Sequence, residues 1–163
     1  MRHPAVLGHP HPRRARGSEQ RIGWAELVAL PDLGLTGLSA KMDSGAATSA
    51  LSAANVAMRQ ADDGSHWVDF TFCQAGGDAA VPCSARLVGH RSVRSSNGRR
   101  EVRPVIETTI ALGTLRWQGQ FTLTNRRAMR FPVLIGRRAL RRGFIVDCSR
   151  RWLLGRPETK DAL

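Results

Sequence analysis

The 163-residue sequence contains no tyrosine, three cysteines, and only two lysines among its 25 basic residues. The cysteines Cys73, Cys83 and Cys148 form no C-x-x-C pair, and an odd number at wide spacing fits neither a disulfide framework nor a zinc knuckle. No apolar run approaches the roughly 18 residues that a membrane-crossing helix needs, and the first 20 residues lack the apolar stretch of a secretory signal. These absences favour a cytoplasmic protein with reduced thiols and no membrane association.

Acidic residues are also scarce, because 13 Asp and Glu face 25 Lys and Arg and leave a formal net charge of +12. Residues 86–156 alone hold 17 arginines against three acidic residues. Such a field attracts polyanions, which makes an acidic peptide or a nucleic acid the natural class of partner. Nucleic acid is the less favoured partner, because the four tryptophans and five phenylalanines do not alternate with basic residues as they do on RNA-recognition strands.

The composition divides the chain into three regions. Residues 1–21 are rich in proline, arginine and histidine without periodicity, so we expect a flexible basic arm. Residues 22–156 form one expected domain, and 157–163 a short tail. Within the domain the apolar stretches are short, alternate with polar residues and are broken by Gly, Pro and Asn, as is typical of strands.

The pattern therefore predicts an all-β protein, a small closed barrel with one short helix. The helix is expected at 137–142, after Gly136 and before Gly143. Turns are expected at 62–64, 75–78, 96–98 and 113–114. The predicted strands span residues 23–30, 38–42, 66–73, 85–93, 103–112, 115–123, 133–135, and 144–147 with 152–154.

One segment carries the clearest chemistry. Residues 38–42 alternate like a strand and lead directly into Asp43, Ser44, Gly45 and Ala46. A carboxylate on such a turn can be held by backbone N–H groups, although an ordinary Asx-turn has the same sequence. A second apolar segment, residues 131–135, ends in Gly136 and Arg137.

These two signatures, in this order, resemble those of retropepsin-like aspartic proteases. Further segments extend the likeness over residues 22–155 to a bacterial family labelled ATP-dependent zinc proteases, whose members occur beside RimK-type ATP-grasp ligases. The matching segments are 22–24, 30–34, 41–46, 48–51, 103–106, 123–126, 129, 134–137 and 146–147.

The resemblance implies an acid-protease barrel in which Asp43 is catalytic and Ser44, Gly45 and Ala46 support it. Aspartic proteolysis needs two carboxylates that share one proton. Because the chain has one such motif, the site would be completed by Asp43 of a second copy in a homodimer. The neighbouring ligases add glutamates to a ribosomal protein, which implies an acidic or polyglutamate-tailed substrate. Thr48, Arg126, Gly136 and Arg137 lie in matching segments and are the candidate substrate-binding residues.

The zinc and ATP labels have little support in the residues. His66 and His90 are the only histidines within the expected fold, and Ser52 stands where family members often carry a histidine. The sequence has neither H-E-x-x-H nor G-x-x-x-x-G-K-[ST]. We therefore expect no metal and no cofactor. Two alternatives to an aspartic endopeptidase remain: a non-catalytic basic module that binds RNA or the ribosome, and a zinc peptidase.

A cover over the substrate is also expected. The turn at residues 95–98 lies between the two motif strands in sequence and has basic neighbours, so it is one candidate. A remote surface hairpin is the alternative for this turn, and residues 55–64 are the alternative cover.

Overall fold

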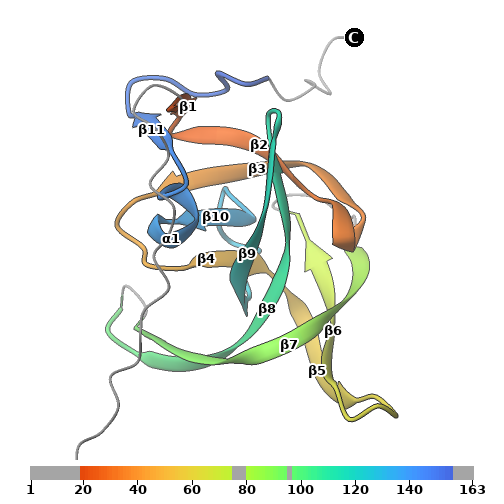
Figure 1. The fold of residues 1–163 in the computed structure, drawn as a ribbon. Coiled ribbons are helices and arrows are strands. Elements are labelled where there is room, and N and C mark those ends of the chain that lie inside the picture. The colour runs from red at the N-terminus through yellow and green to blue at the C-terminus, as the bar shows by residue number, and fades with distance from the viewer. Residues whose placement is uncertain (1–18, 75–79, 95–96, 156–163) are drawn as a thin grey trace, which may run out of the picture.

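The computed structural model describes residues 19–74, 80–94 and 97–155, and these residues are mostly in strands (Figure 1). One α-helix, α1 (Arg137–Leu140), and one 3-10 helix, η1 (Pro31–Leu33), accompany them. No helix in this part of the chain has the length and apolar character needed to cross a membrane. The strands are β1 (Gln20–Gly23), β2 (Ala25–Leu30), β3 (Leu35–Asp43), β4 (Ser49–Ser52), β5 (Ala54–Gln60), β6 (His66–Cys73), β7 (Ala80–Arg94), β8 (Arg100–Leu112), β9 (Leu115–Thr124), β10 (Val133–Gly136) and β11 (Phe144–Asp147).

Six of these strands close a barrel. They follow the order β2-β3-β10-β4-β9-β8, and a pairing between β2 and β8 joins the two ends. The inner face is apolar because side chains alternate along each strand: on β8, for example, Ile106, Ile110 and Leu112 are buried. The expected small all-β barrel with a short helix is therefore confirmed.

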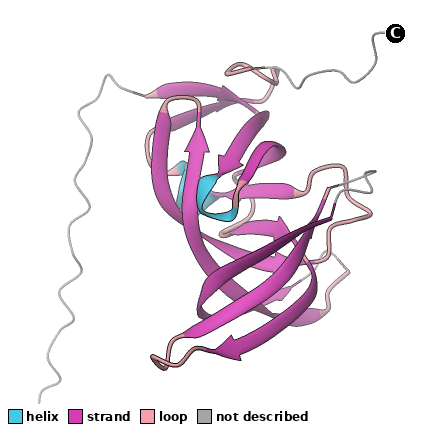
Figure 2. Ribbon diagram, turned by 90° about the vertical axis from the view of Figure 1, so that its right-hand side faces the viewer, coloured by secondary structure: helices cyan, strands magenta, loops and turns pink. Residues whose placement is uncertain are grey.

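The sheet continues beyond the barrel through one long strand. The first half of β7 pairs with β6 and its second half pairs with β8, so β5, β6 and β7 form a meander attached to the barrel wall (Figure 2). The β7–β8 hairpin curves out on the side of Figure 1 where a loop joins β3 to β4. The long hairpin thus extends from the barrel on the side that carries the motif loop.

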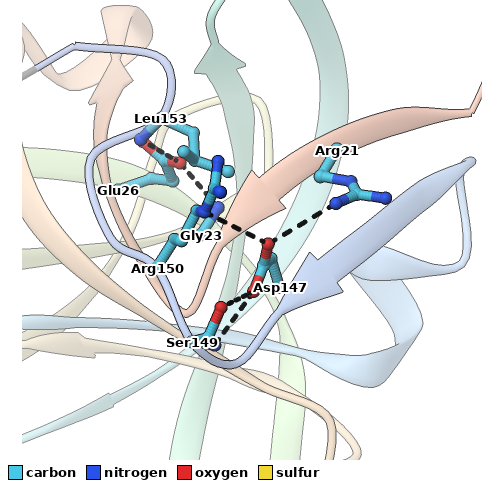
Figure 3. Close-up of polar contacts among 7 residues, drawn as sticks. All are labelled: Arg21, Gly23, Glu26, Asp147, Ser149, Arg150 and Leu153. Carbon is cyan, nitrogen blue, oxygen red and sulfur yellow. Dashed lines mark hydrogen bonds and ion pairs between the residues drawn. The ribbon is translucent and has the colours of Figure 1, made fainter.

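A second feature, here called the clasp, is centred on the buried carboxylate of Glu26, whose register partner on β3 is Ala40 (Figure 3). Glu26 is fully buried and accepts hydrogen bonds from the backbone N–H groups of Gly23 (2.7 Å), Leu153 (2.9 Å) and Leu154 (3.2 Å). Beside it, β1 and β11 pair in parallel. Because Glu26 belongs to β2, its carboxylate links segments from both ends of the described chain to one strand of the barrel.

Several element predictions need correction. Strands β1, β4 and β5 were not predicted, and β1 places Gln20 and Arg21, expected in the arm, in a paired strand. Residues 152–154 are not a strand; they are part of the clasp, with the N–H of Trp152 bonded to the carbonyl of Ala25. The helix ends at Leu140 rather than at residue 142. Turns form at 62–63 and 113–114 as expected, whereas 75–78 and 95–96 lie outside the described residues.

Candidate active site

Asp43 is the last residue of β3 and lies beside the end of β10. The two strands run parallel, and Gly136 is the register partner of Asp43. On its other side β10 pairs antiparallel with β4, so the loop of residues 44–48 passes from β3 to β4 around the end of β10. The two signature segments of the sequence are thereby brought together at one end of neighbouring strands.

Backbone donors fix the Asp43 carboxylate. The N–H groups of Gly45 (3.0 Å) and Ala46 (3.2 Å) both donate to Oδ1. Two such bonds fix the orientation of a carboxylate. The second carboxylate oxygen receives no hydrogen bond from the part of the chain that the structure describes. Asp43 is half-buried while Ser44 and Gly45 are exposed, so the carboxylate is held rigidly and remains reachable from outside.

The start of α1 holds the loop in place. The N–H of Arg137 donates to the carbonyl of Ala46 (2.8 Å), and that of Arg138 to the carbonyl of Ala47 (3.2 Å). The Arg137 side chain reaches back as well, with Nη1 at 2.7 Å from the carbonyl oxygen of Ser44. Arg137, expected at the substrate, therefore has a contact that positions the loop.

Gly136 is required by close packing. A Cβ atom at this residue would lie 2.4 Å from the carbonyl carbon of Thr48, so β10 and the loop are in direct backbone contact. The Gly136 N–H also donates to the buried Oγ of Ser49 (3.1 Å). The structure thus brings Thr48 and Gly136 together as parts of the frame around Asp43.

Arg126 lies in the electrostatic environment of Asp43. Its guanidinium is partly buried, and its Nε donates to the carbonyl of Phe131 (3.0 Å). Burial lowers the pKa of Arg126, the positive charge of Arg103 lowers it further, and the negative charge of Asp43 acts in the opposite direction. Arg103 was not among the predicted site residues, although it begins one of the segments on which the family resemblance depends.

Two other aspartates, Asp32 and Asp147, have structural partners. Asp32 accepts the N–H of Thr109 (2.7 Å) and thereby ties η1 to β8; this backbone bond is the main reason that its pKa is lowered. Asp147 bonds the N–H (2.9 Å) and hydroxyl (2.6 Å) of Ser149, and the hydroxyl is the main cause of its lowered pKa. It also lies within ion-pair distance of Arg21 (3.6 Å; Figure 3). Asp32 lies in η1 and Asp147 is the last residue of β11, so both carboxylates hold neighbouring backbone in place.

No group of three His, Cys, Asp or Glu side chains gathers to hold a metal ion within residues 19–74, 80–94 and 97–155. The site as it stands offers one oriented carboxylate, a glycine on the adjacent strand, and arginines nearby.

A family model described as the retropepsin-like aspartic endopeptidase RimB matches residues 21–157. The chain belongs to this RimB-like family. The resemblance expected from the sequence is therefore confirmed.

Other relatives of this RimB-like chain have a different name. Two proteins named probable alpha-L-glutamate ligase, from Shewanella pealeana and Desulfotalea psychrophila, are 38% and 36% identical to it over 136 residues. The matches cover 82% of this chain but only 30% and 29% of those proteins, so the chain spans under a third of their length. A solved structure of Legionella pneumophila, the protein Lpg0085 of unknown function, has a TM-score of 0.72 at 28% identity over 84% of this chain and 99% of that one.

Proposed function

We propose that this chain is an aspartic endopeptidase that acts as a homodimer on acidic, glutamate-rich peptide tails. The observation that carries the proposal is the half-buried Asp43 carboxylate, which two backbone N–H groups hold through Oδ1 in an exposed loop. The neighbouring strand ends in Gly136 where a second acid would stand in a two-motif enzyme. Each chain therefore supplies half of an aspartic site.

Two copies of Asp43 would share one proton, because like charges a few ångströms apart are not both ionised. The ionised carboxylate takes a proton from a water molecule, whose oxygen bonds to the carbonyl carbon of the substrate. The protonated carboxyl gives its proton to the carbonyl oxygen, which forms a tetrahedral diol. As the C–N bond breaks, the amide nitrogen receives a proton from the pair and one diol hydroxyl returns a proton to it, so that an acid and an amine leave and the shared proton is restored.

Dimer formation is supported by the exposure of the loop. Ser44 and Gly45 are exposed in the single chain, next to a carboxylate that lacks its partner. The Ser44 hydroxyl could then bond across a two-fold axis to the equivalent loop and lock the pair. Burial of this loop by a second copy would also exclude water from the reacting groups.

The preference for glutamate is supported by charge and by the names of relatives. Arginines predominate in the half of the chain that includes β8–β10, and Arg126 lies near Asp43. The Shewanella pealeana and Desulfotalea psychrophila relatives are named as glutamate ligases, so a domain of this type occurs in proteins concerned with glutamate addition. A peptidase that removes such additions fits both observations.

The test is hydrolysis of a glutamate-extended peptide by wild type, Asp43→Asn, and Asp62→Asn as a control in an exposed turn. Asp43→Asn keeps the size of the side chain but removes the general base, so activity should fall at least 1,000-fold while Asp62→Asn stays within twofold of wild type. An excess of Asp43→Asn chain mixed into wild type should inhibit it by forming mixed dimers. Activity of Asp43→Asn within tenfold of wild type, or no inhibition by a chain shown to exchange, would refute the proposal.

A zinc peptidase gives the opposite response to chelation. Activity lost with a chelator and recovered with Zn²⁺ would replace the aspartic mechanism by the metal mechanism. The remaining alternative, a basic module that binds RNA, would show tight RNA binding and no hydrolysis.

A further inference from the structure

Two arginines face each other across the β7–β8 hairpin. Arg91 on β7 is the register partner of Arg103 on β8. Directly opposite residues in an antiparallel pair have Cβ atoms roughly 4.5–5.5 Å apart on the same face, and like charges in that arrangement are destabilising. A third guanidinium, that of Arg126, is close enough for the charge of Arg103 to lower its pKa.

These side chains do not form an ordinary solvated surface. The Arg103 side chain is only 14% exposed. The Nη1 atom of Arg91 is buried and has no hydrogen-bond partner among the described residues. A buried donor without a partner costs free energy, and more so when it is charged. The cluster therefore has a binding capacity that the folded chain itself does not use.

The available counter-charge is also incomplete. Glu101 pairs with Arg103 through Nε (2.9 Å) and Nη2 (2.8 Å), but the Glu101 side chain is itself 52% exposed. Arg126 uses its Nε for the Phe131 carbonyl, which leaves its terminal nitrogens as donors. Among the described residues, Glu101 forms an ion pair with Arg103 and with neither of the other two arginines.

We propose that Arg91, Arg103 and Arg126 form a carboxylate-binding subsite, here called the arginine subsite, which holds the side-chain carboxylate of a substrate glutamate beside the bond cleaved at Asp43. This inference rests on the proposed function. A guanidinium group is planar and can bind a carboxylate through two parallel hydrogen bonds, whereas a lysine ammonium group cannot form this bidentate contact. The bound carboxylate takes the free donor of Arg91 and the terminal nitrogens of Arg126, while Glu101 keeps Arg103 oriented.

Position relative to Asp43 decides which part of a substrate reaches the subsite. Arg103 and Asp43 both act on the pKa of Arg126, so Arg126 is the member of the subsite that is near both Arg103 and the carboxylate of Asp43. A peptide whose scissile bond is at Asp43 therefore presents a nearby side chain to the arginines. Glutamate satisfies the unpaired donor, whereas glutamine of the same shape brings an NH₂ group and no charge.

The experiment compares two peptides that differ only by Glu or Gln beside the scissile bond, hydrolysed by the full chain. Wild type should prefer the Glu peptide at least tenfold in kcat/KM. Arg91→Gln and Arg103→Gln should reduce this preference to about threefold or less, mainly through KM, while the Gln peptide is cleaved within a few-fold of the wild-type rate. Arg116→Gln, an exposed arginine on β9, is the matched control and should retain the full preference.

Binding provides a second measurement that does not depend on turnover. The uncleaved Glu peptide should bind to Asp43→Asn, and adding Arg103→Gln should weaken that binding at least tenfold, with Arg103→Lys intermediate because it keeps the charge and loses the fork. Circular dichroism melts establish that each variant is folded. If Arg91→Gln is unfolded, the Arg103 pair of variants carries the test.

The two proposals fail in different ways. Loss of Asp43-dependent hydrolysis together with retained, Arg103-dependent binding of the Glu peptide overturns the peptidase and leaves a carboxylate site. Hydrolysis whose Glu preference is unchanged in both arginine variants overturns the arginine subsite alone. Binding of single-stranded RNA that depends on Arg91 and Arg103 and displaces no Glu peptide would also overturn it, because the cluster would then serve a phosphate ligand.

Discussion

A methyl group at Gly136 should disable the site through the backbone contact beside Asp43. A Cβ atom there would lie 2.4 Å from the carbonyl carbon of Thr48, 2.6 Å from its oxygen and 2.9 Å from the nitrogen of Ser49. All three are backbone atoms, so no side-chain rotation can relieve the overlap. Since ordinary contact begins near 3.4 Å, β10 and the loop must separate by about 1 Å in Gly136→Ala.

The size of the effect follows from that displacement. Overpacking of this kind costs about 1–3 kcal/mol, which corresponds to a fall in Tm of roughly 2–12 °C for a domain of this size. The loop that moves also carries the two N–H donors of Asp43. Because a 1 Å misplacement of reacting groups can lower a rate roughly 100-fold, we expect kcat/KM to fall about 100-fold.

Gly119→Ala is the matched control. Its added Cβ would meet the Cδ1 atom of Ile110 at 2.3 Å, which is the end of a flexible side chain on the neighbouring strand. It should lower Tm comparably and leave kcat/KM of the folded protein within threefold of wild type. Hydrolysis of a glutamate-extended peptide, measured well below both melting temperatures, separates the two variants. If Gly136→Ala retains a third or more of the wild-type kcat/KM, contact between β10 and the loop does not position Asp43.

Three further predictions concern the frame of the molecule. Glu26→Gln should lower the free energy of unfolding, measured with urea, by about 1–3 kcal/mol, because an amide NH₂ group then faces at least one of three buried N–H donors. An unchanged urea midpoint would show that the Glu26 hydrogen bonds do not stabilise the fold. The pKa of Asp32 is lowered in the folded protein, so its stabilising contribution is present above the ordinary value of 3.8 and is lost as the pH falls through the pKa of the folded state. The difference in stability between wild type and Asp32→Asn should therefore become smaller below pH 3.8. A difference that is the same at pH 6 and pH 3 would contradict this prediction. Gly98 has a φ of +80°, so Gly98→Ala should strain the β7–β8 turn and lower turnover; turnover equal to that of wild type would show that the turn does not cover the substrate.

Local pattern predicted most of the barrel strands, and the missed ones have identifiable causes. Strand β4 is buried along its whole length and consists of Ser, Ala, Leu and Ser, so it shows no alternation. Strand β5 is an exposed edge with almost no buried residue, and no hydrophobic pattern marks it. Strand β1 depends on pairing with β11, more than a hundred residues later in the chain. Strands that are uniformly buried, uniformly exposed or paired over long distances lack the local signal on which such predictions depend.

The sequence predicted the part of the candidate site that depends on local contacts and missed the part that depends on strand pairing. Asp43 and its turn follow from a short motif, because the donors that hold the carboxylate are two and three residues away. The placement of Arg91 opposite Arg103 depends instead on strand register, which includes an irregularity at Leu87–Gly89 in the β7–β8 pairing. Glu26 occupied an ordinary position in a predicted strand, and nothing in its neighbours indicated that segments from both ends of the described chain bind it.

The convergence of those two end segments makes the barrel suited to use as an insertable module. The side chains of Gln20 and Leu154 both approach Gly113 in the β8–β9 turn, at 3.4 Å and 3.1 Å from the position of a Cβ atom there. Domains whose ends lie close together can be joined into a longer polypeptide with little disturbance to either partner. In the relative from Shewanella pealeana named probable alpha-L-glutamate ligase, the matched region is 30% of a longer polypeptide. Fusing a second protein through Gly155 should therefore disturb the barrel little.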